Sequence, residues 1–318
     1  MSDIRIYTAA QAGGLTPLTG DIILCSEAFN GAPANSVHLA LAGGATPTWK
    51  SFANDAEAAS YVYANQYALD LDGTDDYIDC GGASDFGFTD GAGNDSAFTL
   101  SAWVKFDSPT AQRILDKSGS TQASRSYLFG TDGAKRFSIF LGPYNSAAGD
   151  YLYVTETTIL YSGVWYHLVS TYDGSKTAGG ISLYRNGSPS TTTDSSAGNY
   201  AGMPSTSETL KIGKFNLNGS VMNGLIDEVA IFDYELTASE VASLSSADNT
   251  QPVDISTLSI AQPIAWYRMG DDIDRTGTSI KNAANPGTNN GTIVNGTSAN
   301  TTPNFVDLSA TSESVYVA

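Results

Sequence analysis

A run of carboxylates near residue 70 is the part of the sequence whose chemistry is easiest to interpret. Asp70, Asp72, Asp75, Asp76 and Asp79 lie within one short stretch. Carboxylate oxygens are the hard ligands that Ca²⁺ takes in proteins, so this stretch could bind a cation. The alternative is that these side chains only solvate the surface, which is the commoner use of exposed charge.

Asp227 is a second carboxylate with an unusual expected position. Alternation of side chains along a strand would put Leu225, Asp227 and Val229 on one face. If this apolar set faces a core, Asp227 points inward, and a buried carboxylate needs a partner or a cation. The alternative is that Asp227 accepts backbone N–H bonds at a strand end.

Tyrosines beside expected loops and strand ends could form a sugar-binding surface. A flat aromatic ring stacks on the face of a pyranose, while nearby Asn and Asp side chains orient its hydroxyl groups. The alternative is that each tyrosine fills a half-buried strand position, which suits its β propensity. The residues that we expect to bind glycan are Tyr127, Tyr144, Tyr151 and Tyr200.

The sequence offers no recognisable catalytic apparatus. His38 and His167 are the only histidines, and there is no Gly-x-Ser-x-Gly elbow or metal-binding histidine pair. A glycosidase needs two carboxylates at a set separation, and Asp227 and Glu228 followed by Asp233 do not fit such an arrangement. We therefore predict no catalytic residues and no enzyme activity.

The charge balance argues against two classes of partner. The net charge is −18, from 33 acidic and 15 basic residues. Nucleic acid and anionic membrane surfaces bind proteins through Lys and Arg, so we expect no partner of either kind. No run reaches the ~18 apolar residues of a membrane span, so we also expect no membrane insertion.

The N-terminal stretch and the cysteines bear on the cellular compartment. Residues 1–8 contain no apolar run, so we predict no signal peptide and synthesis in a cytoplasm. Cys25 and Cys80 are too few for a disulfide framework or a zinc site, and we expect both to be free thiols.

The candidate residues must be positioned by strands, which the sequence predicts throughout its middle part. Residues 98–106 alternate in the manner of a half-buried strand. One helix is expected at 238–244, because Thr237 and Glu240 form a capping box. Strands separated by turns, with almost no helix, favour an all-β sandwich. Further strands are expected at 113–118, 126–130, 136–142, 151–155, 181–185 and 210–213.

Four blocks of sequence carry a family resemblance: residues 68–79, 98–105, 165–174 and 224–240. In this order and spacing they resemble a laminin-G-like jelly roll of the concanavalin A type. The resemblance implies a two-sheet antiparallel jelly-roll sandwich over residues 65–247, a fold used mostly for binding or assembly. It also implies a structural Ca²⁺ near Asp227, and we expect Asp72 and Asp227 to be metal ligands.

The flanking regions differ from this domain. Residues 1–64 form a small β-rich N-terminal segment, with strands expected at 21–25, 36–41 and 46–52, that loosely resembles small modules of phage tail-fibre proteins. Residues 248–318 resemble the opening of a second laminin-G-like domain whose later blocks are absent. This C-terminal β segment could pack on the first domain or complete a neighbouring subunit by strand addition.

Together these patterns predict a non-enzymatic structural and adhesion protein of a bacteriophage virion. It would be a tail fibre, a tail-tip protein or a head decoration, displayed on the virion surface and binding host-surface glycan through the jelly roll. Its partners would be further copies of the chain, as a trimer or strand-exchanged homo-oligomer, and other virion proteins. The alternatives are a cellular lectin-like carbohydrate-binding module and a glycan hydrolase.

Overall fold

The computed structural model describes residues 22–25, 36–39, 49–51, 67–90, 92–143, 150–245, 252–271, 278–295 and 305–307. The chain divides into two compact units, Met1–Asn65 and Gln66–Ala318. The described part of the first unit is an antiparallel sheet in the order β1-β2-β3. Its strands lie within the three expected ranges: β1 (Ile22–Cys25), β2 (Ser36–Leu39) and β3 (Trp49–Ser51).

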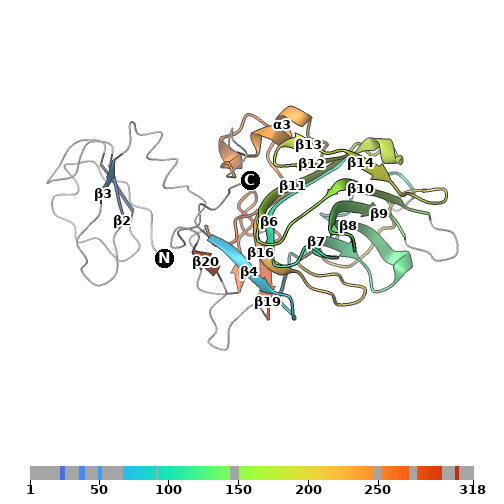
Figure 1. Ribbon diagram of the computed structural model, residues 1–318, viewed down its shortest axis with the longest axis horizontal. Coiled ribbons are helices and arrows are strands. Elements are labelled where there is room, and N and C mark those ends of the chain that lie inside the picture. The colour runs from blue at the N-terminus through green and yellow to red at the C-terminus, as the bar shows by residue number, and fades with distance from the viewer. Residues whose placement is uncertain are drawn as a thin grey trace. The chain divides into compact units, whose positions relative to one another are not determined.

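Two antiparallel sheets build the second unit, which confirms the expected all-β jelly-roll sandwich (Figure 1). One sheet has the order β13-β12-β11-β6-β16-β4-β20, with β17 also paired to β16. Its strands are β4 (Tyr67–Asp72), β6 (Phe98–Phe106), β11 (Trp165–Tyr172), β12 (Ile181–Arg185), β13 (Ser188–Pro189), β16 (Asn223–Phe232), β17 (Ala265–Tyr267) and β20 (Phe305–Asp307).

The other sheet has the order β14-β10-β9-β8-β7-β15-β5-β19-β18. Its strands are β5 (Tyr77–Asp79), β7 (Arg113–Ser118), β8 (Arg125–Thr131), β9 (Arg136–Leu141), β10 (Leu152–Ile159), β14 (Thr192–Asp194), β15 (Lys211–Ile212), β18 (Ser279–Ile280) and β19 (Gly291–Val294). Short 3₁₀ turns interrupt the connections: η1 (Gln122–Ser124), η2 (Ala178–Gly180) and η3 (Ile255–Thr257).

The hydrophobic core lies between these sheets, because strand alternation turns one side of each sheet inward. Phe98 and Leu100 of β6 belong to the same buried cluster as Phe129 of β8 and Ile139 of β9. Burying each such side chain contributes about 1.5–3 kcal/mol, so this shared layer holds the two sheets together.

A short helix covers part of the outer face of the β6–β16 sheet. Helix α3 (Ala238–Ser243) starts at Thr237, whose side chain accepts from the Glu240 N–H, so the expected capping box is present. Val241 of the helix packs with Phe232 of β16 and Trp266 of β17 in a second buried cluster. This face of the sheet is therefore buried as well as the core face.

The described residues beyond 251 add strands to both sheets. β17 and β20 join the β6–β16 sheet, whereas β18 and β19 extend the other sheet beside β5. We expected the C-terminal segment either to pack on the first domain or to complete a neighbouring subunit. In this structure its described residues pack on the jelly roll of their own chain.

A bulge in β16 puts Asp227 on the outer face of the sheet and not on the core face, although its side chain is fully buried, as the sequence predicts. The register of β16 against β6 shifts between Asp227 and Ala230, and Glu228 has a φ of +46°. Before the bulge, Ile226 shares the core face with Val104, so its neighbour Asp227 lies on the outer face, paired with Trp103. Strict alternation was therefore wrong here, because an extra residue in one strand resets its side-chain pattern.

Among the helices of the described residues, none is long and apolar enough to cross a membrane.

Candidate functional site

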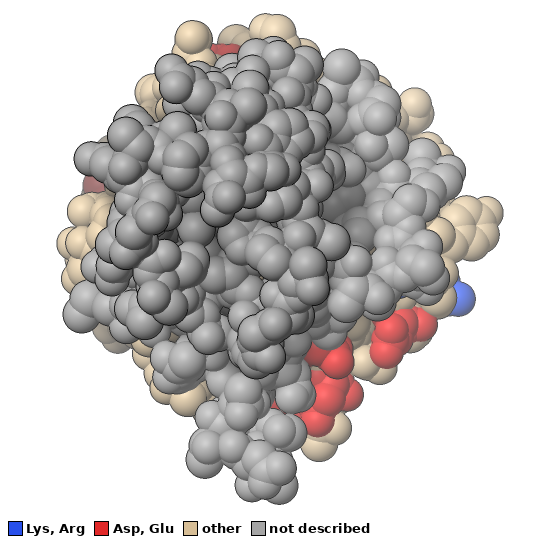
Figure 2. Space-filling model, turned by 90° about the vertical axis from the view of Figure 1, so that its left-hand side faces the viewer, with Lys and Arg blue, Asp and Glu red and all other residues tan. Residues whose placement is uncertain are grey.

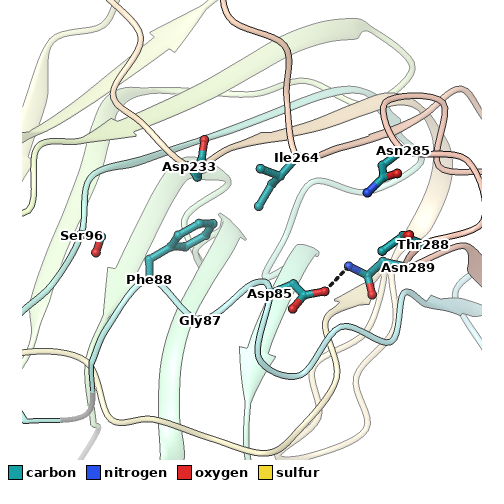
Figure 3. Close-up of a pocket in the computed structure, with 9 residues that line it drawn as sticks. All are labelled: Asp85, Gly87, Phe88, Ser96, Asp233, Ile264, Asn285, Thr288 and Asn289. Carbon is teal, nitrogen blue, oxygen red and sulfur yellow. Dashed lines mark hydrogen bonds between the residues drawn. The ribbon is translucent and has the colours of Figure 1, made fainter.

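A cleft of about 440 Å³ opens between the β5–β6 connection and the C-terminal part of the second unit (Figure 3). Its residues come from chain segments that are far apart in the sequence, and Asp85 and Asn289 are 204 positions apart. The lining consists of Asp85, Gly87, Phe88, Ser96, Asp233, Ile264, Asn285, Thr288 and Asn289.

A tight turn positions the first wall of the cleft. The N–H groups of Asp85 and Phe86 both donate to the carbonyl of Gly82, at 3.1 and 3.2 Å. Gly82 has a φ of +60°, and a Cβ at this position would come within 2.6 Å of the Phe86 ring. Glycine is therefore required here, and the turn that it makes directs Asp85 towards the cleft.

A buried asparagine positions the opposite wall. The Asn282 Oδ1 accepts from the Trp266 N–H at 3.0 Å, and its Nδ2 donates to the Thr288 carbonyl at 3.1 Å. The Asn289 Nδ2 then donates to Asp85 Oδ2 at 2.8 Å, which joins the two walls (Figure 3). This bond lowers the pKa of Asp85 below its usual value, so its carboxylate is an ionised acceptor at neutral pH.

The cleft combines an apolar patch with a polar rim. Phe88 packs against Phe98 with ring centroids 4.6 Å apart, and Ile264 lines the cleft beside it. Carboxylates from Asp85 and Asp233 and the amide of Asn285 stand around this patch (Figure 3). A sugar presents the matching pair of surfaces, because the C–H face of a pyranose is apolar and its hydroxyls donate and accept hydrogen bonds.

The sequence patterns do not predict this cleft. The local signal for it is the Asn- and Gly-rich stretch at 282–291, which by itself resembles only part of a domain opening. Its proximity to Asp85 depends on the pairing of β19 with β5, and nothing in the local pattern of either segment indicates that pairing.

The expected glycan-binding tyrosines do not gather in one place. Tyr127 is fully buried in the core, with its hydroxyl donating to the Phe86 carbonyl at 3.1 Å, so its ring cannot stack on a ligand. Tyr144 lies outside the described residues. Tyr200 donates to Asp95 Oδ2 at 2.6 Å, and burial together with this carboxylate raises its pKa. Tyr151 is half-buried beside Phe140, with ring centroids 4.8 Å apart.

Asp72 and Asp227 fall into two separate acidic groups rather than one. Asp72 lies with Asp75 and Asp76, whose carboxylate oxygens come within 4.8 Å of one another. Burial raises the pKa of Asp76, and the charges of Asp72 and Asp75 raise it further. A cation would relieve this crowding, so the residues of this group fit a Ca²⁺ ion.

The second group, formed by Asp227, Glu228 and Asp271, fits a metal less well. Its carboxylate oxygens also lie within 4.8 Å of one another, but Arg268 Nε donates to Glu228 Oε1 at 3.1 Å. A guanidinium therefore already supplies positive charge. Asp227 Oδ1 accepts a hydrogen bond from the Glu228 N–H at 2.7 Å. A backbone bond of this kind is the alternative to a cation that the sequence allows for Asp227.

His167 is a buried side chain on the outer face of the β6–β16 sheet, beside Trp103, and is not placed as a catalytic base. It is 1% exposed, and its ring stacks on Trp103 with centroids 5.0 Å apart. Burial lowers the pKa of His167 to about 3, so the imidazole is neutral at physiological pH. Its Nε2 bonds with the Ser101 hydroxyl at 2.9 Å.

The fold defines the class of protein, which is a two-sheet antiparallel jelly-roll sandwich. A family match spans residues 72–242, more than half of the chain, and the chain belongs to the family described as the concanavalin A-like lectin/glucanases superfamily.

Several solved structures are similar to this chain at low sequence identity. A "putative carbohydrate binding protein" from Bacteroides ovatus has a TM-score of 0.52 and 16% identity, over 92% of this chain and 71% of its own. The CBM40 of the Ruminococcus gnavus IT-sialidase has a TM-score of 0.43 and 14% identity, over 57% of this chain and 100% of its own. The SAP-like pentraxin of Limulus polyphemus has a TM-score of 0.38 and 15% identity, over 59% of this chain and 86% of its own. No curated protein matches the sequence.

Proposed function

We propose that this chain is a non-catalytic adhesion protein that binds glycan in the cleft beside Phe88. The observation that carries the proposal is the composition of that cleft, in which an aromatic and aliphatic patch is surrounded by acceptors and amide donors. Because Phe88 is only 4% exposed, hydrogen bonds between the rim and the sugar hydroxyls would supply most of the binding, with the small apolar patch against the C–H face of the sugar. The Bacteroides ovatus protein is similar to this chain in fold, and its printed description as a carbohydrate binding protein supports the proposal of glycan binding.

We further propose that the protein acts on the surface of a bacteriophage virion, as a fibre, tip or decoration protein in a homo-oligomer. The separate N-terminal unit supports this arrangement, since it could attach to the particle while the jelly roll faces outward. The strongly acidic composition also suits a surface-exposed protein, because a high net charge keeps copies soluble.

Glycan binding can be tested on the full chain by calorimetric titration with neutral gluco-, galacto- and manno-oligosaccharides. The test variant is the double substitution Asp233→Asn with Asn285→Ala, because both side chains are exposed on the rim and neither is expected to support the fold. The matched control is Asp194→Asn with Asn199→Ala, at exposed positions away from the cleft.

The expected result is binding of at least one oligosaccharide, weakened about tenfold in the rim variant and unchanged in the control. Equal affinity in the wild type, the rim variant and the control would exclude the cleft as the glycan-binding site. Release of shorter sugars during the titration, detected by chromatography, would favour the hydrolase alternative.

Absolute mass measured by light scattering tests the proposed assembly. We expect the full chain to form a trimer or another closed homo-oligomer. A monomer at micromolar concentration would instead favour a self-contained lectin-like module.

We also propose a structural Ca²⁺ at Asp72, Asp75 and Asp76, with the group around Asp227 as the alternative position. Calcium would neutralise the crowded carboxylates and fix the β4–β5 turn, in which the Asp72 N–H donates to Asp76 Oδ2 at 3.3 Å.

A further inference from the structure

The outer face of the β7–β10 sheet carries an arrangement of side chains that the cleft does not use. Two guanidinium groups lie over aromatic rings there, and two half-buried tyrosines stand beside them. We call this surface the arginine face; it consists of Arg113, Arg125, Phe140, Tyr151, Tyr153 and Phe215.

The strand register brings these residues together. Phe140 of β9 is paired with Tyr153 of β10 on one side and with Leu128 of β8 on the other. Leu128 in turn is paired with Asp116 of β7. Cross-strand partners share a face, so this row projects outward while Tyr127 and Ile139 project into the core.

The aromatic rings hold the guanidinium groups in place. The Cζ of Arg125 lies 4.6 Å from the centroid of the Phe140 ring and 5.1 Å from that of Phe215. The Cζ of Arg113 lies 5.0 Å from the Phe215 centroid. The rings cover the flat sides of the two guanidinium groups, and a carboxylate approaches a guanidinium from its edge, with two parallel bonds.

Arg113 retains donor capacity. Its Nη1 donates to the carbonyls of Gln112 and Thr131, at 3.2 and 2.9 Å. Its buried Nε has no hydrogen-bond acceptor within the part of the chain that the structure describes. Leaving such a buried donor unmatched costs free energy, and only the exposed part of the guanidinium is open to an anionic ligand.

The face carries net positive charge in a chain whose net charge is −18. Asp132, which interacts with Tyr153, is neutralised by Arg136, whose Nη2 lies 2.7 Å from its Oδ2. Asp116 is buried, and burial raises its pKa to about 6, although hydrogen bonds and both arginines lower it. At neutral pH its carboxylate therefore offsets one of the two arginine charges, and one positive charge remains. On the face drawn in Figure 2, most of the coloured charged side chains are red carboxylates.

We propose that the arginine face is a second binding site, which takes the carboxylate of an acidic saccharide. The carboxylate would accept from Arg113 and Arg125, and the sugar ring would lie against Tyr151 and Tyr153. This site is separate from the cleft, and the proposal holds whether or not the cleft binds neutral glycan.

The test uses the full chain and three pairs of probes that differ in the carboxylate. These are trigalacturonate and its methyl ester, a glucuronate disaccharide and its methyl ester, and sialyllactose and lactose. We expect at least one acidic member to bind and its neutral partner to bind about tenfold more weakly or not at all. If none of the acidic probes binds, or if acidic and neutral partners bind equally, the proposal is wrong.

Variants then locate the site. Arg125→Gln should weaken binding of the acidic probe about tenfold, and Arg125→Lys should weaken it less, because the charge remains but the planar fork is lost. The control is Lys135→Gln, which removes the same charge from an exposed turn and should leave affinity unchanged. Thermal unfolding of each variant distinguishes loss of the site from loss of the fold.

Two further outcomes would overturn the proposal. If the cleft variant Asp233→Asn with Asn285→Ala loses the acidic probe, the binding belongs to the cleft. If a tetraglutamate peptide binds as tightly as the acidic sugar, the face recognises anionic peptides and the tyrosines do not select a saccharide.

Discussion

The outer face of the β6–β16 sheet is buried, whereas the outer face of the β7–β10 sheet keeps charged and aromatic side chains half-exposed. Both faces carry arginine, carboxylate and aromatic residues. On the buried face, Glu228 is 4% exposed and bonds with Arg268 and the Trp266 indole N–H. On the open face, Arg113 and Arg125 lie over rings and retain contact with solvent.

The difference shows how one set of residue types serves two purposes. Where a sheet face is covered, each polar group must be matched inside the protein, because unmatched burial is costly. Where the face stays open, a ligand can supply hydrogen-bond or charge partners to the same kinds of polar group. Substitutions should therefore affect stability on the buried face and binding on the open face.

The largest expected effect is on the buried ion pair. Arg268→Met should lower the free energy of unfolding by about 3–5 kcal/mol, because it leaves Glu228 charged and buried without its cation. The comparison variant Arg125→Gln on the open face should cost about 1 kcal/mol or less. Urea denaturation of both variants measures this, and equal costs would remove the distinction between the faces.

The next effect is a loss of stability in acid that comes from His167. The pKa of this buried imidazole is about 3 in the folded state and about 6.5 when unfolded, so the unfolded chain binds more protons between these values. Stability is therefore lost as pH falls below about 6.5, by about 2 kcal/mol between pH 7 and pH 5. Unfolding of His167→Gln at both pH values should show a smaller difference than wild type; an unchanged difference would contradict this assignment.

Asp116, under the open face, should act in the opposite direction and more weakly. Its folded pKa is about 6, above the ordinary value of 3.8, so the folded state holds a proton that the unfolded state has released. Its contribution is present below pH 3.8 and is lost as pH rises through about 6, by about 1 kcal/mol between pH 5 and pH 7. Asp116→Asn should remove that loss, and steeper pH dependence in this variant would show the sign to be wrong.

Calcium is expected to have the smallest effect on stability. Its test compares the group of Asp72, Asp75 and Asp76 with the group of Asp227, Glu228 and Asp271. At a Ca²⁺ concentration about twice the Kd, the linkage relation gives about 0.6 kcal/mol, or a rise in Tm of about 2 °C. Asp75→Asn should abolish this rise, whereas Asp227→Asn should leave it in place. The reverse pattern would move the site to the group that contains Asp227.

Residue patterns predicted the sandwich because strand alternation and turn residues are local signals. The same is true of the helix cap, where Thr237 and Glu240 are three positions apart and bond as expected. Asp227 was misplaced because the bulge at Glu228 resets alternation, and no feature of that short stretch indicates an extra residue. Tyr127 was misplaced because its ring is apolar enough to fill the core while its hydroxyl reaches a backbone carbonyl.

The cleft and the arginine face could not be predicted from spacing. Asp85 and Asn289 form one cleft although they are 204 positions apart. Arg113 and Phe215 are also brought together only by neighbouring strands, β7 and β15. Such contacts depend on which strands pair, and each sheet of a jelly roll admits many pairings that satisfy the same alternating pattern.

The pairing of β20 with β4 has a consequence for synthesis. Phe305 is opposite Leu69. The first strand of the second unit, β4, therefore pairs with a strand that is synthesised near the end of the chain. At about 5–20 residues per second, a ribosome needs on the order of ten seconds or more to make the chain between them. Until then β4 has an open edge, and a nascent chain would need its neighbours or a chaperone to protect that edge from pairing with another copy.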